Sequence, residues 1–201
     1  MFLLAALIFA NGFLSQCGPA VSPVTTRAVI EVESAGNPLA IGDNSLKKSF
    51  SPRSKSEAVK LAATLIAKGH SVDLGLMQIN NVHLAPMRLS LQEVFDPCRN
   101  VRAGTTILSD FYKRYQMGDP AFSLYKALSA YNTGESWKGA GYVNRILAAA
   151  GVTYRVLFVP LPDPAFASDC AGKRHDAKNS SRASKLFFGN VTTAMVSRGG
   201  L

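Results

Sequence analysis

Glu33 is the residue of this 201-residue chain whose setting best suits it to acid catalysis. Residues three and four apart share a helix face, so Glu33 lies over Val29 and Ile30, whereas Glu31 lies over Arg27. We therefore expect Glu31 to be solvated and Glu33 to be half buried. A carboxyl against apolar surface loses hydration, which raises its pKa and suits it to donate a proton near neutral pH. A solvated glutamate with no catalytic part is the alternative that helical spacing alone leaves open.

The helix that must position Glu33 is predicted over residues 22–35. Ser22 can cap its start, apolar residues recur at helical spacing, and Gly36 ends it. The chain then turns towards a strand expected near residues 39–43. A second strand is expected over residues 71–75, where apolar and polar residues alternate. Together these two strands would form a small antiparallel hairpin beside Glu33.

The rest of the central region is predicted to be helical. Two capping boxes, Ser54 with Glu57 and Ser90 with Glu93, mark helix starts. The polar stretch 47–53 is expected to be an irregular loop. The further helices are expected over residues 54–69, 90–96, 97–118, 122–131 and 142–151. This order of elements predicts a mainly α domain with a small antiparallel sheet, in the α+β class.

The two ends of the chain differ from this central region. Residues 1–16 are apolar, and they favour a buried first helix over a signal peptide, because no Lys or Arg precedes the apolar run. A start codon placed too far downstream is a third interpretation. The run is too short to span a bilayer, so no transmembrane anchor is indicated. Residues 159–201 are predicted to be a Pro-rich linker and a basic, disordered tail, which leaves residues 17–158 as the domain.

The net charge of +9 favours partners that are polyanions, such as nucleic acid, anionic lipid or acidic cell wall. Residues 165–201 hold six basic and two acidic residues and contribute +4, which leaves +5 for the remainder. No single binding face is evident from this distribution. A nucleic-acid binder is disfavoured because the charge is dispersed and lacks interleaved aromatic residues.

The cysteines and histidines indicate no metal site and no cofactor. Cys17, Cys98 and Cys170 lack metal-ligand spacing, so either one disulfide with one free thiol or three reduced thiols is compatible with them. The scattered histidines are predicted to be surface residues and do not support a Ser-His-Asp arrangement. These histidines are His70, His83 and His175.

Three segments carry a resemblance to a known family. They are Glu33-Ser34 followed by Asn37-Pro38-Leu39-Ala40-Ile41, then Gly75-Leu76-Met77-Gln78-Ile79-Asn80, then Ala130-Tyr131-Asn132-Thr133-Gly134. In this order they resemble the catalytic domain of soluble lytic transglycosylases (the SLT type), which is similar to goose-type lysozyme. Ser71-Val72-Asp73, Pro97-Cys98 and Gly141-Tyr142-Val143 make the chain most similar to the transglycosylase subunit of type IV secretion and conjugation systems.

The resemblance implies a mainly α, lysozyme-like fold with a small antiparallel β-hairpin and a groove for peptidoglycan glycan strands. Members of the family cleave between N-acetylmuramic acid and N-acetylglucosamine without water and leave a 1,6-anhydro end. Glu33 would be the single acid and base, and no metal or cofactor would be needed. The residues that would line the groove are Ser34, Met77, Gln78, Asn80, Tyr131 and Asn132.

The resemblance also bears on the cysteines, the partners and the location of the protein. It favours a Cys17–Cys98 disulfide and aligns residues 6–16 with a helix of the domain. Type IV secretion components are implied as partners. A periplasmic location follows from the substrate, although the sequence holds no clear export signal.

Two other functions compete with this one. A hydrolytic, lysozyme-like muramidase would need a second carboxylate, such as Asp43 or Asp73, to activate water. A non-catalytic adaptor would only grip glycan or recruit secretion proteins. The presence of Glu33 together with all three groove motifs argues against the adaptor.

Overall fold

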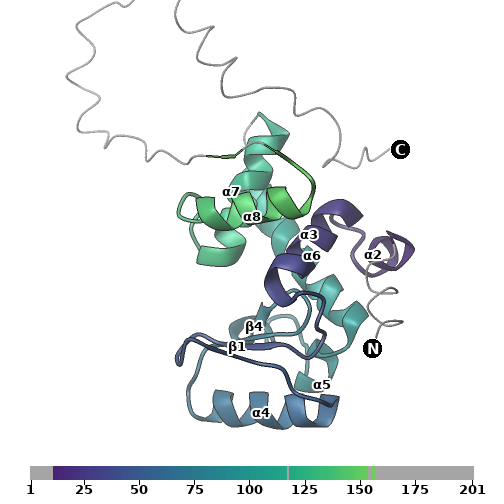
Figure 1. Ribbon diagram of the computed structural model, residues 1–201, viewed down its shortest axis with the longest axis vertical. Coiled ribbons are helices and arrows are strands. Elements are labelled where there is room, and N and C mark those ends of the chain that lie inside the picture. Colours follow the sequence, from purple (N-terminus) through teal and green to yellow (C-terminus); the bar gives the residue numbers. More distant parts are fainter. Residues whose placement is uncertain (1–10, 117, 154, 157–201) are drawn as a thin grey trace, which may run out of the picture.

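The computed structural model describes residues 11–116, 118–153 and 155–156 as a mainly helical domain with a four-stranded antiparallel sheet (Figure 1). The predicted fold class is therefore confirmed. The predicted tail over residues 159–201 lies outside the described residues, as do residues 1–10. No helix in the described ranges is both long enough and apolar enough to cross a membrane.

The elements follow one another in the order that the sequence predicts, with two added strands, β2 and β4. Their bounds are α2 (Asn11–Cys17), α3 (Pro23–Ser34), β1 (Ile41–Asp43), β2 (Lys48–Phe50), α4 (Lys55–Ala67), β3 (Val72–Leu74), β4 (Ile79–Asn80), a 3-10 turn η1 (Asn81–His83), α5 (Leu91–Val94), α6 (Pro97–Arg114), α7 (Pro120–Thr133) and α8 (Ala140–Ala149). The sheet lies between α4 and the group formed by α3, α7 and α8, and α5 lies beside the sheet, where it contacts both α4 and α6 (Figure 1).

The sheet has the strand order β2-β1-β3-β4, with every neighbouring pair antiparallel. The expected pairing of residues 39–43 with 71–75 is confirmed, because Ile41 lies opposite Leu74 in the β1–β3 ladder. The prediction of an irregular loop over residues 47–53 is wrong, because β2 lies within it. Its three residues are too few to show an alternating pattern, and pairing with β1 rather than local preference makes them a strand.

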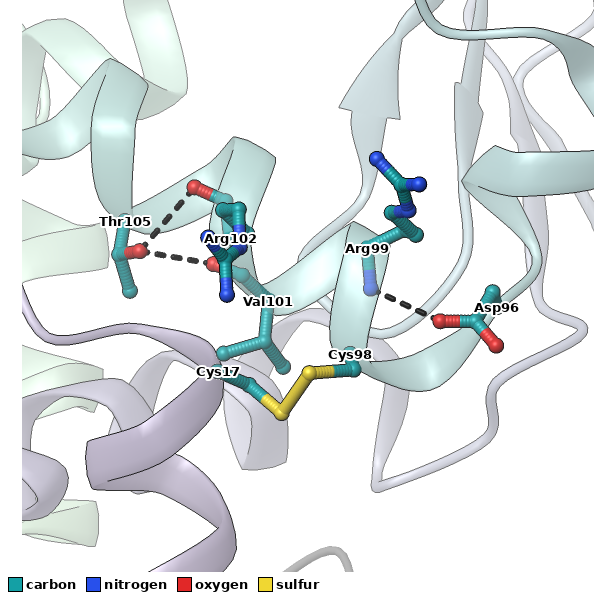
Figure 2. Close-up of a disulfide and its surroundings, with 7 residues drawn as sticks. All are labelled: Cys17, Asp96, Cys98, Arg99, Val101, Arg102 and Thr105. Atoms are coloured by element: carbon teal, nitrogen blue, oxygen red, sulfur yellow. Dashed lines mark hydrogen bonds between the residues drawn. A yellow bond between two sulfur atoms is a disulfide. The ribbon is translucent and has the colours of Figure 1, made fainter.

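Helix α2 is tied to the start of α6 by a disulfide between Cys17 and Cys98 (Figure 2). The two Cα atoms are 5.0 Å apart, and the bond joins residues separated by 81 positions. Leu14 of α2 is fully buried. Residues 11–16 of the predicted N-terminal segment are therefore helical, and Leu14 anchors this helix in the domain core.

Helix α6 begins at residues whose side chains explain its start. Asp96 caps it by accepting a hydrogen bond from the N–H of Arg99 at 2.9 Å, and Pro97 occupies its first turn (Figure 2). The preceding helix α5 has the predicted capping box at Ser90. The prediction that α6 continues to about residue 118 is wrong, because it ends at Arg114.

Candidate active site

Glu33 is the penultimate residue of α3, where the helix ends abruptly. Ala35 adopts a left-handed conformation with φ of 51°, and its N–H bonds to the carbonyl of Glu31. Gly36 follows with φ of 76°. Two left-handed residues in succession turn the chain away from the helix axis. Glu31 is exposed and Glu33 is half buried, as helical spacing predicts.

Burial raises the pKa of Glu33 to about 7, because the charged carboxylate loses its hydration there. A hydrogen bond from the Tyr142 hydroxyl to Glu33 Oε1, 2.6 Å long, opposes this rise. The carboxylate of Asp73 adds to the rise, while the Arg145 cation lowers the pKa. Glu33 is therefore present in both protonation states near neutral pH, as a group that works in turn as acid and base requires.

Glu33 faces a pocket of about 280 Å³ between the helices and the sheet. The helical side contributes Glu33 from α3, Ile107 from α6, and Tyr131 and Asn132 from α7. The sheet side contributes residues of the β1–β2 turn, β3, the β3–β4 turn, β4 and η1, namely Asn44, Asp73, Gln78, Ile79, Asn80 and His83. The pocket thus has one ionisable carboxyl on its helical side, and its sheet side holds amide groups and one further carboxyl.

That further carboxyl, Asp73, is held between two amides. Asn44 Nδ2 donates to its Oδ2 at 2.8 Å, and Asn80 Nδ2 donates to its Oδ1 at 2.7 Å. Burial raises the pKa of Asp73, whereas the two amide hydrogen bonds lower it. Asn80 Nδ2 also donates to Ser71 Oγ at 2.9 Å. The orientation of Asp73 is therefore fixed on both sides.

Gln78 closes the turn between β3 and β4 with a left-handed backbone at φ of 48°. Its Nε2 donates to the carbonyl of Gly75 at 2.8 Å and to the carbonyl of Ala40 at 3.2 Å. Its Oε1 lies against Gly42, where an added Cβ would approach it to 2.9 Å. Gln78 thus links this turn to the residue before β1, and its amide side chain lines the pocket in a fixed orientation.

Ser34 and Met77 lie behind the pocket and are not among its lining residues. Ser34 Oγ donates to the carbonyl of Leu76 at 2.8 Å, which joins the end of α3 to the β3–β4 turn. The Met77 side chain is fully buried, and its carbonyl accepts a hydrogen bond from the Tyr131 hydroxyl at 2.8 Å. These contacts hold Glu33 and Tyr131 in place from the second layer of residues.

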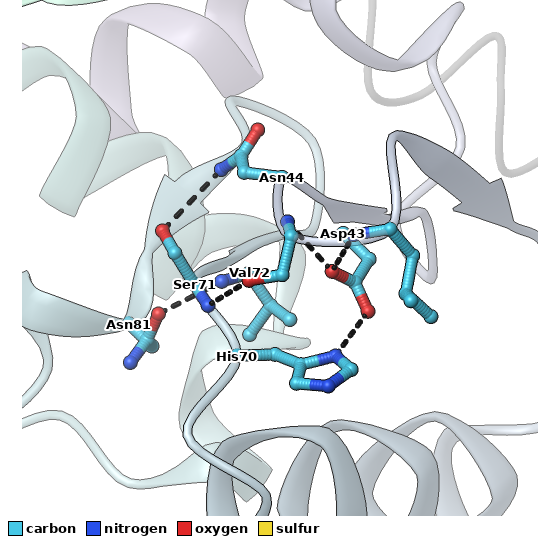
Figure 3. Close-up of polar contacts among 8 residues, drawn as sticks. Asp43, Asn44, His70, Ser71, Val72 and Asn81 are labelled. Carbon is cyan, nitrogen blue, oxygen red and sulfur yellow. Dashed lines mark hydrogen bonds and ion pairs between the residues drawn. The ribbon is translucent and has the colours of Figure 1, made fainter.

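Asp43 lies outside the pocket lining. Its Oδ2 is 2.7 Å from His70 Nδ1 (Figure 3), and its Oδ1 accepts from the N–H groups of Ser45 and Leu46 at 2.9 and 3.0 Å. Burial opposes the charge of Asp43, but these hydrogen bonds outweigh it and lower its pKa. Asp43 therefore organises the β1–β2 turn, and of the two candidate second carboxylates it is Asp73 that lines the pocket with Glu33.

Of the seven predicted catalytic and binding residues, the structure brings five to the pocket lining: Glu33, Gln78, Asn80, Tyr131 and Asn132. His70 and His83, which were predicted to be surface residues, are both half buried: His70 Nδ1 bonds to Asp43, and His83 lines the pocket. His175 lies outside the described residues. Tyr142, which bonds to Glu33, was not predicted as a site residue, although its Gly-Tyr-Val segment supported the family resemblance.

We expect Tyr142→Phe to shift the pH dependence of activity upwards. Removing the hydroxyl removes a hydrogen bond that lowers the pKa of Glu33, so the acid form should persist to higher pH. The alkaline decline of kcat/KM should move above its wild-type position, with a rate loss of roughly tenfold. Tyr112→Phe, at a half-buried tyrosine outside the pocket, is the matched control. An unshifted profile would remove Tyr142 from the site.

Comparison with known proteins places these residues in a family context. The family model described as Transglycosylase SLT domain matches residues 13–142. The type IV secretion system protein virB1 of Brucella abortus is 35% identical over 167 residues, which cover 76% of this chain and 70% of the relative. Protein virB1 of Agrobacterium fabrum is 34% identical over 151 residues, or 73% of this chain and 62% of the relative. The invasion protein IagB of Salmonella typhi is 34% identical over 134 residues, or 65% and 66%. No solved structure matches the chain.

Proposed function

This chain belongs to the transglycosylase SLT domain family and is a peptidoglycan lytic transglycosylase, and we propose that Glu33 is its single catalytic acid and base. The observation that carries the proposal is the position of Glu33 in the pocket with a pKa raised to about 7 by burial. A carboxyl with the usual pKa would be almost entirely ionised at neutral pH and unable to donate a proton.

In the first step, protonated Glu33 donates its proton to the glycosidic oxygen between N-acetylmuramic acid and N-acetylglucosamine. The bond from that oxygen to C1 of the muramyl sugar then breaks, and positive charge develops on the sugar. Glu33 is left as a carboxylate. The Tyr142 hydroxyl, 2.6 Å from Glu33 Oε1, stabilises the negative charge as it forms.

In the second step, the Glu33 carboxylate accepts the proton of the muramyl C6 hydroxyl while that oxygen bonds to C1. The product is a 1,6-anhydro ring, and Glu33 is again protonated for the next turnover. Because nucleophile and electrophile belong to one sugar, the step is intramolecular and gains from proximity. One carboxyl therefore suffices where hydrolytic glycosidases use two.

Uncharged groups of the pocket would hold the sugars during both steps. Burial raises the pKa of Tyr131 well above its usual value, so its hydroxyl remains neutral. The amides of Gln78, Asn80 and Asn132 can pair with sugar hydroxyls and acetamido groups without adding a fixed charge. We assign Ser34 and Met77 a positioning role, because their contacts fix the end of α3 and Tyr131.

Hydrolysis is the second candidate reaction, because Asp73 lines the same pocket as Glu33 and could activate water. We expect Asp73→Asn to keep releasing anhydro-muropeptides, since Glu33 supplies both proton transfers. The Asp73 charge raises the pKa of Glu33, so its removal should also move the alkaline decline of activity to lower pH. Mass spectrometry of the released muropeptides checks the products. Reducing ends from the wild type that disappear in Asp73→Asn would establish a hydrolase instead.

We further propose that the enzyme opens peptidoglycan locally for a type IV secretion or conjugation apparatus. The support is the similarity to two virB1 proteins, one of them named as a type IV secretion system protein. The proposed site of action is the periplasm, where peptidoglycan lies. The Cys17–Cys98 disulfide fits an oxidising compartment of this kind.

A further inference from the structure

The positive charge outside the tail is concentrated in one segment. Residues 44–71 carry six basic residues and one acidic residue, a net charge of +5. Residues 1–43 and 72–164 together carry ten basic and ten acidic residues, so they contribute no net charge. This distribution corrects the sequence-based interpretation that no single face carries the excess.

This segment forms one end of the molecule, which we call the basic lobe. It comprises the β1–β2 turn, the edge strand β2, the following loop and α4, which lies at the lower end of the molecule in Figure 1. All of its cationic residues are exposed: Lys47, Lys48, Arg53, Lys55, Lys60 and Lys68.

Few carboxylates compete for these cations. Glu57 accepts a hydrogen bond from the backbone N–H of Arg53 at 2.9 Å, so it serves the helix cap. The carboxylate of Glu93 in α5 interacts electrostatically with Lys55. None of the ion pairs found among the described residues includes a cation of the basic lobe. The lobe therefore presents positive charge that the domain itself does not neutralise.

The basic lobe is continuous with the pocket through the β1–β2 turn. Asn44 lines the pocket, and Lys47 and Lys48 follow it within four residues. Polymer that extends from the pocket past Asn44 would meet these lysines first. The lobe is thus placed to contact parts of the substrate that lie outside the cleaved bond.

We propose that the basic lobe binds the carboxylates of the peptide stems of peptidoglycan, an inference that rests on the proposed function. The glycan backbone is uncharged once its lactyl groups are joined to peptide, so the negative charge of the polymer lies on the stems. Lysines on flexible side chains suit carboxylates whose positions vary from stem to stem. Among the described residues, Leu46 is the one large hydrophobic side chain exposed in the lobe, which argues against membrane insertion.

The test compares two triple variants of the full chain, each carrying Glu33→Gln so that the polymer is not degraded. The lobe variant is Lys47→Gln, Lys48→Gln and Lys60→Gln. The control removes the same charge from exposed positions of α6 through Arg99→Gln, Arg102→Gln and Arg114→Gln. Co-sedimentation is measured with intact peptidoglycan and with stripped strands, which are amidase-treated glycan strands whose freed lactyl carboxylates have been converted to neutral amides. The stripped strands therefore carry neither peptide stems nor their negative charge.

The lobe variant should bind intact peptidoglycan roughly fivefold more weakly than the parent at low salt, and the difference should shrink as salt is added. The control variant should bind like the parent, and all three proteins should bind stripped strands equally. An equal loss in the control, or an equal loss on stripped strands, would overturn the proposal. Binding to duplex DNA and to anionic vesicles is measured in the same way. If the lobe variant binds one of these more weakly than the parent but binds peptidoglycan equally well, the lobe has another partner and the proposal is wrong.

The proposed function is tested separately, with Glu33 restored in both triple variants. On stripped strands these enzymes should match the wild-type turnover, because none of the replaced residues lines the pocket. Absence of turnover in the wild type would contradict the proposed function while leaving the binding comparison intact. If the lobe variant, but not the control variant, cleaves stripped strands more slowly than the wild type, the basic lobe does not act through the peptide stems alone and the proposal is wrong.

Discussion

Glu33→Gln is expected to reduce kcat on purified peptidoglycan by about a thousandfold or more. General acid–base catalysis by one positioned group contributes a factor of roughly a hundred to ten thousand, and Glu33 acts in both proton transfers. Glutamine has nearly the same shape but neither donates nor accepts the proton. The measurement is the initial rate of soluble muropeptide release. Glu31→Gln, at the exposed glutamate of the same helix, should retain the wild-type rate.

The loss in Glu33→Gln should not come from unfolding. The pKa of Glu33 is raised by folding from 4.5 to about 7, so its contribution to stability is fully present below pH 4.5 and is lost as the pH rises through about 7. Glutamine stays neutral throughout. The variant should therefore be at least as stable as the wild type at mildly alkaline pH. A variant that is inactive because it is unfolded would leave the catalytic assignment without support.

Replacing Cys17 and Cys98 by serine should lower the free energy of unfolding by about 4 kcal/mol. The disulfide closes a loop between residues 81 positions apart, and a loop of this length restricts the unfolded chain strongly. Urea denaturation of both proteins measures the difference. The rate at low temperature should change little, because neither cysteine lines the pocket.

Reduction of the wild-type protein provides the control for this effect. The reduced wild type should unfold at the same urea concentration as the double serine variant, because both lack the same cross-link. A wild-type midpoint that does not respond to reductant would contradict the account. It would mean that packing of α2 against α3 and α6, and not the disulfide, supplies most of the stability of this region.

Local patterns in the sequence predicted much of the fold because these elements are determined by nearby residues. Ser90 and Glu93 form the predicted capping box, and helical spacing correctly distinguished Glu33 from Glu31. The family resemblance drawn from three short segments is confirmed by the family model and the relatives. Strand β2 was missed because its pairing with β1, and not its own composition, makes it a strand.

The site was harder to predict because its geometry depends on contacts between distant segments. Tyr142 reaches Glu33 across 109 positions, and Tyr131 reaches the carbonyl of Met77 across 54. A side chain in a binding motif can also serve from behind the pocket, as the buried Met77 does. Spacing along the sequence does not show in which direction these side chains point or which distant residue they contact.

The most direct test of the central claim is to digest peptidoglycan with the wild-type enzyme in water enriched in the heavy oxygen isotope. Mass spectrometry then shows whether new muramyl ends contain oxygen from the solvent. If Glu33 passes the C6 hydroxyl proton and no water enters, the ends will be 1,6-anhydro sugars without label. Reducing ends that carry the heavy isotope would show that water is the nucleophile, and the account of a single acid and base would be wrong.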